Sequence, residues 1–404
     1  MNCIIAQSGG PTSVINSSVY GVVKENFNLK IYDNVYGGLN GIEGILEKKI
    51  INLSSMDQDR LETFKNSPSS GLGSCRYKLK DFNNTEEEYI KLMEILENLK
   101  VSTFFYVGGN DSMDTTAKLS AYAKLKDIDI KFIGIPKTID NDLKYTDHTP
   151  GFGSAGRFIS TSVLESYLDS KVYSNNGIFI LEAMGRDTGW LASTAALAHI
   201  NGKPCADLIY LPEISFCKEK FLKDVKALFK ENNHVYIVAS EGIRDAMGTF
   251  VAETESPCHD NFGHAQLGGV GATLRSLIIN AGITDRVKSL ELGVLQRCAM
   301  HCSSKVDLFE AEMVGRAALS YSDDCESGLM VGIKRLNHPI YKSESFLIDA
   351  KKVANNVKYF PSHWINEEGN GITSDAIAYL SPLINDSNMA SDETHLPIYD
   401  SFAI

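Results

Sequence analysis

The feature of this sequence that most restricts its fold is a repeated unit: a short apolar run, a turn rich in Gly or polar residues, and a helix-like segment. In the first unit the run 3–6 is followed by the turn 8–12, and a helix is expected from about Ser13. Further units contain strand-like runs at 103–107, 131–135, 178–181 and 235–239, and helix-like segments at 113–125 and 190–199. Apolar runs without alternation are typical of strands buried on both faces, as in a parallel sheet covered by helices. The sequence therefore predicts an α/β fold with two doubly wound lobes and mostly parallel sheets.

Size and charge restrict the partners of such a fold. The chain has 404 residues, which at about 150 residues per domain suggests two or three domains. Its formal net charge of −12 argues against duplex nucleic acid or an anionic membrane as a partner, although a local site can still bind a small anion. No apolar run approaches the roughly 18 residues of a membrane span, the N-terminus lacks the basic region of a signal peptide, and 8 Cys are too few for a disulfide scaffold. We expect a cytoplasmic protein with no nucleic-acid or membrane partner.

Two glycine-rich segments resemble phosphate-binding turns. Residues 151–156 match G-x-G-x-x-G, but residues 145–150 before them do not read as a strand. A dinucleotide-binding turn is therefore disfavoured, and these glycines are expected to let a helix start close to a polar loop. The turn 8–12 does follow a strand and open a helix, where free N–H groups and a partial positive charge suit a phosphate. Glycine can also serve the geometry of this turn alone, so both interpretations stay open there.

More specific chemistry is present in the turns 108–112 and 136–142, which would converge if their strands are neighbours in the sheet. The second turn combines a cation, a hydroxyl group and two carboxylates at the end of a buried strand. Asp140 and Asp142 suit a metal-bound phosphate, or a base directed at a hydroxyl group. Lys137 can neutralise charge on a phosphoryl group during its transfer. The alternative is a solvated loop, which seldom follows a buried strand.

These segments and several others occur in the order and spacing of a known family. From about residue 3 to residue 320 the chain resembles the phosphofructokinases, which transfer a phosphoryl group to the 1-hydroxyl of fructose 6-phosphate. Besides the two turns above, the matching segments are Gly9-Gly10-Pro11 with Asn16, Gly71-Leu72-Gly73-Ser74-Cys75-Arg76, Met184-Gly185-Arg186, Ser240-Glu241-Gly242 and Leu295-Gln296-Arg297. Their common order argues against chance agreement.

The resemblance implies a role for each matching position. Asp140 would be the base that accepts the proton of the sugar 1-hydroxyl, and Arg76 would hold the phosphoryl group being transferred. Gly10 would place its backbone against the donor phosphates, Thr138 would contact the transferring phosphoryl group, and Asp142 would support the metal side. The residues expected to bind the sugar phosphate are Thr138, Ile139, Asp140, Met184, Gly185, Arg186, Glu241, Val294, Leu295, Gln296, Arg297 and, in place of an Arg, Lys288.

Two departures from the ATP-using pattern indicate the phosphoryl donor. ATP-dependent members usually carry Gly-Gly-Asp-Gly and Pro-Gly-Thr at the two turns, whereas Asp111 and Lys137 replace the two glycines here, as in the pyrophosphate-dependent branch. A carboxylate at position 111 would face the third phosphate of ATP. Two like charges about 4 Å apart at an effective dielectric near 20 repel by roughly 4 kcal/mol, or about a thousandfold in affinity. We therefore expect pyrophosphate as the donor, with Asp111 and Lys137 setting donor specificity and contributing to the transition state.

Other departures affect the metal and the sugar phosphate. Asn110 is the expected metal-side residue, but it stands where most members carry Asp, and a neutral amide would bind Mg²⁺ more weakly, through water. Gly177 and Val294 occupy positions where well-known ATP-dependent members carry Arg and His. Other cations, such as Arg335 or Lys342, would then have to hold the 6-phosphate. No basic cluster predicts an allosteric nucleotide site.

The resulting prediction is a cytoplasmic, Mg²⁺-dependent enzyme of the pyrophosphate-using branch, whose reversible reaction serves glycolysis or gluconeogenesis. Residues 1–140, completed by part of 285–335, would form the phosphoryl-donor lobe. Residues 141–284 would form the sugar-phosphate lobe, and 336–404 an extension that packs on the lobes. Because family members complete their active sites with a neighbouring subunit, a homodimer or homotetramer is implied.

Three alternatives stay open at this point. One is an ATP-dependent phosphofructokinase, and another is the same reaction on a different acceptor, such as sedoheptulose 7-phosphate. The third is a non-catalytic regulatory subunit that binds sugar phosphate or an effector. The presence of Asp140, Asp142, Arg76 and Arg186 argues against this third alternative, because a degenerate subunit would have lost some of them.

Overall fold

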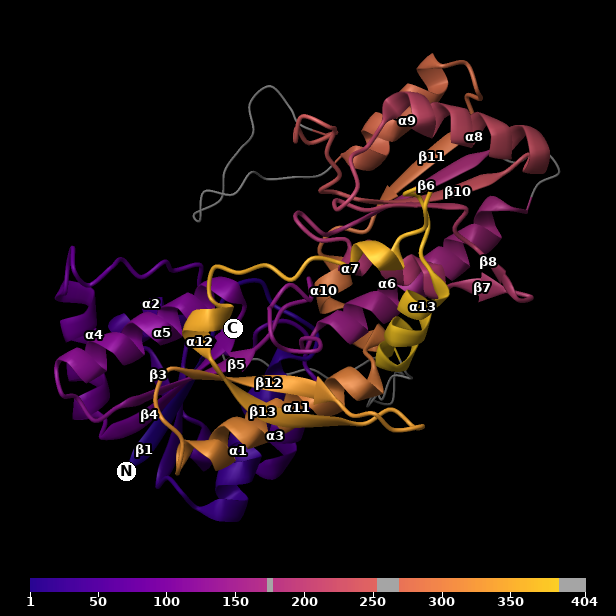
Figure 1. Ribbon diagram of the computed structural model, residues 1–404. Helices are drawn as coiled ribbons and strands as arrows, with labels where there is room; N and C mark the ends of the chain where they lie inside the picture. Colours follow the sequence, from indigo (N-terminus) through magenta and orange to yellow (C-terminus); the bar gives the residue numbers. More distant parts are fainter. Residues whose placement is uncertain (173–176, 253–268, 385–404) are drawn as a thin grey trace. The chain divides into compact units, whose positions relative to one another are not determined.

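The computed structural model describes residues 1–172, 177–252 and 269–384. These residues form two compact units, and each unit is built around a sheet of its own (Figure 1). Helix α6 (Phe152–Ser170) leads the chain from unit 1 into unit 2, and α10 (Leu295–Cys298) leads it back.

The units divide the chain differently from the expected boundary after residue 140. Unit 1 comprises Met1–Ser154 and Arg297–Val357, and unit 2 comprises Ala155–Gln296 and the described residues 358–384. The segment expected as an extension from residue 336 onward is thus shared between the units, and residues 385–404 lie outside the described part. What the sequence presented as an extension supplies secondary structure to both units.

Backbone contacts explain why the segment after residue 140 belongs to unit 1. The amide of Asp147 donates a hydrogen bond of 2.8 Å to the carbonyl of Ile333, and Leu143 forms an antiparallel bridge with Val357. Both partners come from the C-terminal part of unit 1. Such long-range pairings cannot be read from the local pattern on which the boundary was based.

Unit 1 contains a seven-stranded sheet in the order β13-β12-β5-β4-β1-β2-β3. The five central strands pair in parallel, and the edge strands β13 and β3 are antiparallel to their neighbours. The prediction of a mostly parallel sheet is confirmed. The strands are β1 (Asn2–Gln7), β2 (Asn34–Gly38), β3 (Ile50–Asn52), β4 (Val101–Gly108), β5 (Lys131–Pro136), β12 (Leu329–Arg335) and β13 (Ser343–Asp349). The helices are α1 (Ile15–Leu29), α2 (Gly41–Leu46), η1 (Leu53–Ser55), α3 (Gln58–Lys65), α4 (Glu87–Asn98), α5 (Asn110–Leu125), η3 (Met300–Cys302), α11 (Lys305–Ser322) and α12 (Ala350–Val353).

The side chains of β1 explain why its sequence is apolar throughout. Cys3 and Ile5 point into a cluster formed with residues of α1 and α11, whereas Ile4 and Ala6 point into a cluster formed with residues of α4 and α5. All four are fully buried. Full burial of an Ile side chain such as Ile4 or Ile5 stabilises the fold by about 1.5–3 kcal/mol, so helices on both faces of the sheet account for the unbroken run.

Unit 2 contains a four-stranded parallel sheet in the order β11-β6-β10-β9, together with the short antiparallel pair β7-β8. Its strands are β6 (Ile178–Ala183), β7 (His199–Ile200), β8 (Lys203–Pro204), β9 (Leu208–Tyr210), β10 (Val235–Ser240) and β11 (Val287–Glu291). Its helices, apart from α6 and α10, are α7 (Trp190–Ser193), η2 (Thr194–Leu197), α8 (Lys218–Asn232), α9 (Val270–Asn280), η4 (Ser362–Trp364), α13 (Ser374–Leu380) and η5 (Ser381–Ile384).

The helix expected over 190–199 is shorter than predicted. Helix α7 ends at Ser193, η2 continues to Leu197, and residue 199 belongs to β7. The hydroxyl of Ser193 donates to the carbonyl of Trp190 at 2.7 Å, and that of Thr194 donates to the carbonyl of Leu191 at 2.6 Å. Hydroxyl groups that bond to nearby carbonyls compete with the regular helix, which explains the change to 3₁₀ geometry at this point.

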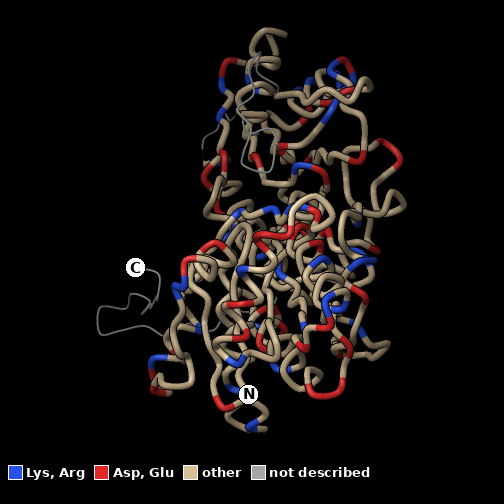
Figure 2. Tube along the Cα trace, turned by 90° about the vertical axis from the view of Figure 1, so that its left-hand side faces the viewer, with Lys and Arg blue, Asp and Glu red and all other residues tan. Residues whose placement is uncertain are grey.

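Charged residues of both signs are interspersed along the described trace (Figure 2). None of the helices among the described residues is long and apolar enough to span a membrane.

Candidate active site

The polar turns of unit 1 meet at one edge of its sheet. Strands β1, β4 and β5 are neighbours, and Gly108 at the end of β4 is in register with Pro136 at the end of β5. The amide of Lys137 donates to the carbonyl of Gly108 at 3.0 Å, and the amide of Ser8 donates to the carbonyl of Val107 at 2.9 Å. The turns after β1, β4 and β5 therefore lie side by side, and the predicted convergence of the turns after β4 and β5 is confirmed.

Lys137 is the most deeply buried cation at this edge. Its side chain is 3% exposed, and Nζ donates to the carbonyl of Gly10 at 2.6 Å. Burial lowers the pKa of Lys137 to about 8, an effect that Asp140 and Asp142 partly offset. Lys137 therefore stays mostly protonated at neutral pH. A Cβ atom at Gly9 would lie 3.2 Å from Nζ, so a glycine at this position leaves room for the ammonium group.

Two guanidinium groups share this edge with Lys137. A Cβ atom at Gly10 would lie 3.3 Å from Nη1 of Arg297, which places that guanidinium beside the first turn. Burial and the charge of Arg76 lower the pKa of Arg297, and both arginines lower the pKa of Lys137. Arg297 was expected in the sugar-phosphate set, and the structure brings it to the turns of unit 1. Three cations within mutual electrostatic reach form a strong site for phosphate oxygens.

The loop that carries Arg76 is fixed by two buried amides. The side chain of Gln7 donates to Asn16 at 2.8 Å and accepts from the amide of Leu72 at 3.0 Å. The side chain of Asn16 accepts from the amide of Gly71 at 2.9 Å and donates to the carbonyl of Ser67, also at 2.9 Å. Sequence reasoning gave these amides no role. A buried amide side chain beside a glycine-rich loop was the available signal, because such a group requires partners.

The second turn alternates accessible and buried residues. Thr138, Asp140 and Asp142 are partly accessible, whereas Ile139 and Asn141 between them are buried. The amide of Asp140 donates to the hydroxyl of Thr138 at 3.1 Å, which closes a local turn. Ile139, expected to bind the sugar phosphate, has its side chain buried, so only its backbone is suited to contact a ligand.

A buried charge network anchors the loop that follows this turn. His148 is 1% exposed, and its two ring nitrogens lie 2.9 Å from Asp147 and 2.6 Å from Glu310. Glu310 also accepts hydrogen bonds of 2.6 Å from the hydroxyls of Tyr341 and Ser343. Burial alone would lower the pKa of His148, but the two carboxylates outweigh burial and raise it to about 9. The loop is therefore fastened to α11 by an imidazolium.

This network predicts a loss of stability at alkaline pH. The pKa of His148 is about 9 in the folded chain against 6.5 for an ordinary His, so its contribution is complete below pH 6.5 and is lost as the pH rises through 9. The expected loss is up to about 3 kcal/mol. The free energy of unfolding in urea is measured for the wild type and for His148→Gln from pH 6 to 9.5. The difference between the two proteins gives the contribution of His148, because the titration of Lys137 affects both of them equally. A difference that stays constant over this range would contradict the assignment.

The start of α5 presents Asn110 and Asp111 from the first turn of a helix that Gly109 caps. Asp111 is partly accessible, and a carboxylate here is favoured by the positive end of the helix. The amide of Asn110 is held by backbone: Nδ2 donates to the carbonyl of Asn356 at 2.7 Å, and Oδ1 accepts from the amide of Asn355. Asn110 was the expected metal-side residue, and its contacts favour a different role.

The glycine-rich segment 151–156 is the start of a helix, as expected. Helix α6 begins at Phe152, and the carboxylate of Asp307 accepts from the amides of Gly151 and Ser154, both at 2.8 Å. Burial raises the pKa of Asp307 to about 6. Because a side chain of the protein already occupies these amides, this helix start does not offer a dinucleotide phosphate its usual partners.

A second set of predicted residues meets at the carboxyl edge of the sheet in unit 2. The amide of Met184, after β6, donates to Gln296 at 2.9 Å, and the amide of Gly185 donates to Glu241, after β10, at 3.3 Å. Gly185 has φ +136°, a conformation that favours glycine. A Cβ atom at Gly242 would lie 2.0 Å from the carbonyl oxygen of Arg186, so the two turns cross closely. The structure thus brings Met184, Gly185, Arg186, Glu241 and Gln296 together.

Three other predicted residues are placed differently. Val294 and Leu295 are 57% and 56% exposed in the segment after β11. Lys288 is the second residue of β11 and is exposed near the amino end of the strand, away from the set at the carboxyl edge. Gly177, where well-known ATP-dependent members were expected to carry Arg, precedes β6, and a Cβ atom there would lie 2.2 Å from the carbonyl oxygen of Arg286. This backbone therefore excludes any larger residue at position 177.

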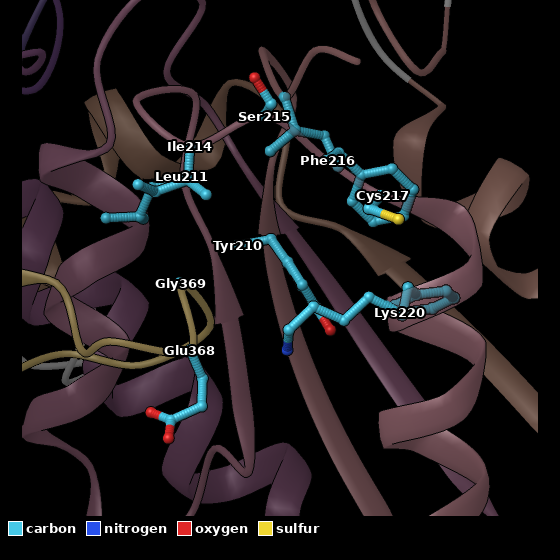
Figure 3. Close-up of a pocket in the computed structure, with 11 residues that line it drawn as sticks. Tyr210, Leu211, Ile214, Ser215, Phe216, Cys217, Lys220, Glu368 and Gly369 are labelled. Carbon is cyan, nitrogen blue, oxygen red and sulfur yellow. The ribbon is translucent and has the colours of Figure 1, made fainter. Parts of the chain in front are cut away.

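A separate hollow in unit 2 lies beside the carboxyl end of β9. It is lined mostly by apolar and aromatic side chains, including Tyr210, Phe216 and Phe221. Figure 3 shows the side chain of Lys220 extending from α8 toward Tyr210. Lys220 forms an ion pair of 2.5 Å with Asp224. Because its cation is paired and its walls are apolar, we assign no part of the phosphate chemistry to this hollow.

Comparison with known proteins shows which family this chain resembles. The phosphofructokinase family model matches residues 2–321. The chain is 39% identical to the pyrophosphate--fructose 6-phosphate 1-phosphotransferase of Xanthomonas campestris over 99% of this chain and 96% of that relative. It is 33% identical to the sulfofructose kinase of Alkalicoccus urumqiensis over 85% of this chain and 86% of that one.

A solved structure shows the same fold along nearly the whole chain. The crystal structure of pyrophosphate-dependent phosphofructokinase from Nitrosospira multiformis superposes with a TM-score of 0.89 at 34% identity, covering 98% of this chain and 95% of that one. The family model, these relatives and the two residue sets at the carboxyl edges lead to one conclusion: the chain belongs to the phosphofructokinase family.

Proposed function

We propose that this enzyme transfers a phosphoryl group reversibly from pyrophosphate to the 1-hydroxyl of fructose 6-phosphate, giving fructose 1,6-bisphosphate and phosphate. The relatives with pyrophosphate-dependent names support this reaction. The choice of donor rests mainly on the position of Lys137, whose Nζ donates a hydrogen bond to the carbonyl of Gly10. The side chain fills the space that a glycine would leave for a longer donor, and it adds a cation there.

The phosphoryl donor binds to unit 1 in this proposal. The backbone around Gly10 contacts the pyrophosphate, and Lys137, Arg76 and Arg297 surround it with positive charge. Thr138 contacts the phosphoryl group that is transferred. The assignment of the three cations is supported by the positions of Lys137 and Arg297 beside Gly9 and Gly10, and by the lowering of the pKa of Lys137 by both arginines and of Arg297 by Arg76.

The residues of unit 1 also fit a Mg²⁺ ion that is bound together with the donor. Mg²⁺ in phosphoryl-transfer enzymes is usually held by one or two carboxylates plus phosphate oxygens, so a closed protein cage is not needed. Among the described residues no group of three or more His, Cys, Asp or Glu forms such a cage. Asp140 and Asp142 both lie near enough to Lys137 to raise its pKa. We assign Asp142 to the ion, which would neutralise charge on the donor phosphates, whereas Asp111 is assigned to the choice of donor.

Asp140 is the general base of the proposed reaction. It accepts the proton of the 1-hydroxyl while the hydroxyl oxygen forms a bond to the phosphorus of the transferred group. The bond between this phosphorus and the bridging oxygen of pyrophosphate breaks, and phosphate leaves. Lys137 and the two arginines offset the negative charge on the phosphoryl oxygens. Because these cations are held in place before the reaction, they stabilise the charge of the transition state without having to reorganise.

The sugar phosphate binds to unit 2 through the set around Met184, Gly185, Arg186 and Glu241. The guanidinium of Arg186 suits an anion, and the carboxylate of Glu241 suits sugar hydroxyls. Lys288 lies near the amino end of β11, whereas these residues lie at the carboxyl edge of the sheet. We therefore assign Lys288 to the 6-phosphate that is bound by a second copy of the chain. A homodimer or homotetramer follows from this assignment.

We place the reaction in the cytoplasm. The seven cysteines in the described part of the chain form no disulfides with one another, which suits a reducing compartment. The phosphorylated substrates also suit an intracellular enzyme of glycolysis or gluconeogenesis.

A parallel assay tests the reaction directly. Fructose 1,6-bisphosphate formation is followed with fructose 6-phosphate and Mg²⁺, using pyrophosphate in one reaction and ATP in the other. We expect turnover with pyrophosphate, and a rate with ATP that is lower by about a thousandfold or more. Turnover with ATP alone would overturn the choice of donor. Inactivity with both would point to another acceptor or to a non-catalytic protein.

One observation favours a second acceptor. A relative at 33% identity is named sulfofructose kinase. This chain carries Gly177 and Val294 where well-known ATP-dependent members were expected to carry Arg and His, so the group at the 6-position of the sugar would meet fewer cations. An acceptor with a sulfonate in place of the 6-phosphate carries one charge fewer and needs fewer cations. Pyrophosphate-dependent turnover of sulfofructose with kcat/KM above that of fructose 6-phosphate would make it the preferred acceptor.

A further inference from the structure

A short C-terminal segment of unit 1 contacts both turns of the donor site. Residues 354–357, here called the tether segment, follow α12. The amide of Asn355 and the carbonyl of Asn356 both bond to the side chain of Asn110 at the start of α5. Val357 forms an antiparallel bridge with Leu143, which directly follows Asp142. One segment thus joins the turn of Asp111 to the turn of Asp140 and Asp142.

The tether segment is itself held in one conformation. Asn355 has φ +58° and its side chain donates to Asp114 of α5 at 3.2 Å. The side chain of Asn356 donates back to the carbonyls of Lys352 and Ala354 at 3.0 and 3.1 Å. Ala354 belongs to a buried cluster with Met113, Leu143 and Val353. Because these contacts fix the conformation of the tether segment, the segment can in turn fix the two turns to which it is bonded.

The contacts of Asn110 require an amide. Its oxygen accepts from one backbone N–H and its nitrogen donates to one backbone carbonyl, and an ionised carboxylate of the same size can only accept. An Asp at this position would place a carboxylate oxygen against the carbonyl of Asn356. This explains why the chain carries Asn where a metal-binding Asp was expected from the family.

We propose that Asn110 is a positioning residue rather than a Mg²⁺ ligand, and that through the tether segment it fixes Asp111 relative to Asp140 and Asp142. The proposal rests on the proposed function for its catalytic consequence. Its structural part stands on the contacts alone. Proton acceptance and phosphoryl stabilisation need groups on two different turns to be aligned, and misplacement by about 1 Å lowers rates by roughly a hundredfold.

The first experiment is kinetic and compares Asn110→Asp with Asn110→Ala. A positioning role predicts that both variants lower kcat by about 10- to 100-fold, that neither variant lowers the Mg²⁺ concentration for half-maximal rate, and that the KM for fructose 6-phosphate changes by less than about twofold. A ligand role predicts instead that Asn110→Asp keeps or gains activity and needs less Mg²⁺. That second result would overturn the proposal.

Two further variants test the tether segment itself. Asn355→Ala loses the bond to Asp114 and disfavours the left-handed backbone, so kcat is expected to fall by about 3- to 10-fold. Asn355→Gly loses only the bond and should recover most of that rate. Asn370→Ala, in unit 2, removes an amide whose oxygen accepts from Asn366 and whose nitrogen donates to Asp224, and it serves as the matched control. An equal loss in this control would overturn the positioning role.

A measurement without catalysis separates this proposal from the reaction assignment. Hydrogen exchange of Asn110→Ala is compared with the wild type by mass spectrometry, for peptides that contain residues 139–145. The described hydrogen bonds of the Asn110 side chain go to residues 355 and 356. Faster exchange in residues 139–145, by about tenfold, is therefore expected only if the tether segment couples the two turns. Unchanged exchange in these peptides would overturn the proposal even if the enzyme is active, and faster exchange would support it even if pyrophosphate is not the donor.

Discussion

Replacement of Asp140 by Asn is expected to lower kcat by about 10² to 10⁴, with only a modest change in the KM for fructose 6-phosphate. Asn keeps the size of the side chain and its hydrogen-bonding oxygen but cannot accept the proton of the 1-hydroxyl. The turn itself should persist, because the amide of residue 140 bonds to the hydroxyl of Thr138 and the side chains of Ile139 and Asn141 stay buried. Initial rates at saturating pyrophosphate and Mg²⁺ measure the effect.

The matched control for this variant is Asp142→Asn, two residues along the same turn. It removes an equal charge near Lys137 without removing the base, so its main effect should be a higher Mg²⁺ requirement. A rate for Asp140→Asn within a few-fold of the wild type would remove Asp140 from the role of base. A larger loss in kcat for Asp142→Asn than for Asp140→Asn would exchange the two assignments.

The central strands and their turns could be predicted from the sequence because their signals are local. The run 3–6 is apolar at every position because helices cover both of its faces, and this burial leaves a direct trace in the residue types. The turns after β4 and β5 carry charged residues at the end of buried strands, a combination that seldom occurs without function. Their convergence followed from the parallel sheet and was confirmed by the pairing of β4 with β5.

The features that could not be predicted depend on contacts between distant parts of the chain. The hydrogen bonds from the side-chain amide of Asn110 to the backbone of residues 355 and 356 could not be predicted, because nothing in the local sequence of α5 identifies those partners. The place of Arg297 beside Gly10 depends on the return of the chain into unit 1 through α10. The antiparallel edge strand β13 was missed for a related reason: the region after residue 335 carries no turn with recognisable chemistry.

Donor selectivity is expected to depend on the charge of Asp111 and on the side chain of Lys137 in different ways. Lys137→Gly should lower the pyrophosphate-dependent kcat by about 10² to 10³, because it removes a buried cation from the phosphoryl group and the bond from Nζ to the carbonyl of Gly10. The same variant should not gain ATP activity by itself, because the carboxylate of Asp111 is retained. Rates with both donors at saturating Mg²⁺ test these two statements.

The contribution of Asp111 can be divided into charge and size by two substitutions. Asp111→Asn removes the charge and keeps the volume, whereas Asp111→Gly removes both. If repulsion of roughly 4 kcal/mol excludes ATP, Asp111→Asn should raise kcat/KM for ATP by up to about a thousandfold, and Asp111→Gly should add little to that gain. If the volume of the side chain excludes ATP, only Asp111→Gly should act.

The double variant Asp111→Gly/Lys137→Gly completes the test. With glycine at positions 111 and 137, the space beside Gly9 and Gly10 that Nζ of Lys137 fills becomes available to a longer donor. The gain in ATP activity should then exceed that of Asp111→Gly alone, because the side chain of Lys137 still restricts a longer donor in that single variant. A double variant that is no better with ATP than Asp111→Gly would mean that Lys137 serves pyrophosphate chemistry without a role in excluding ATP.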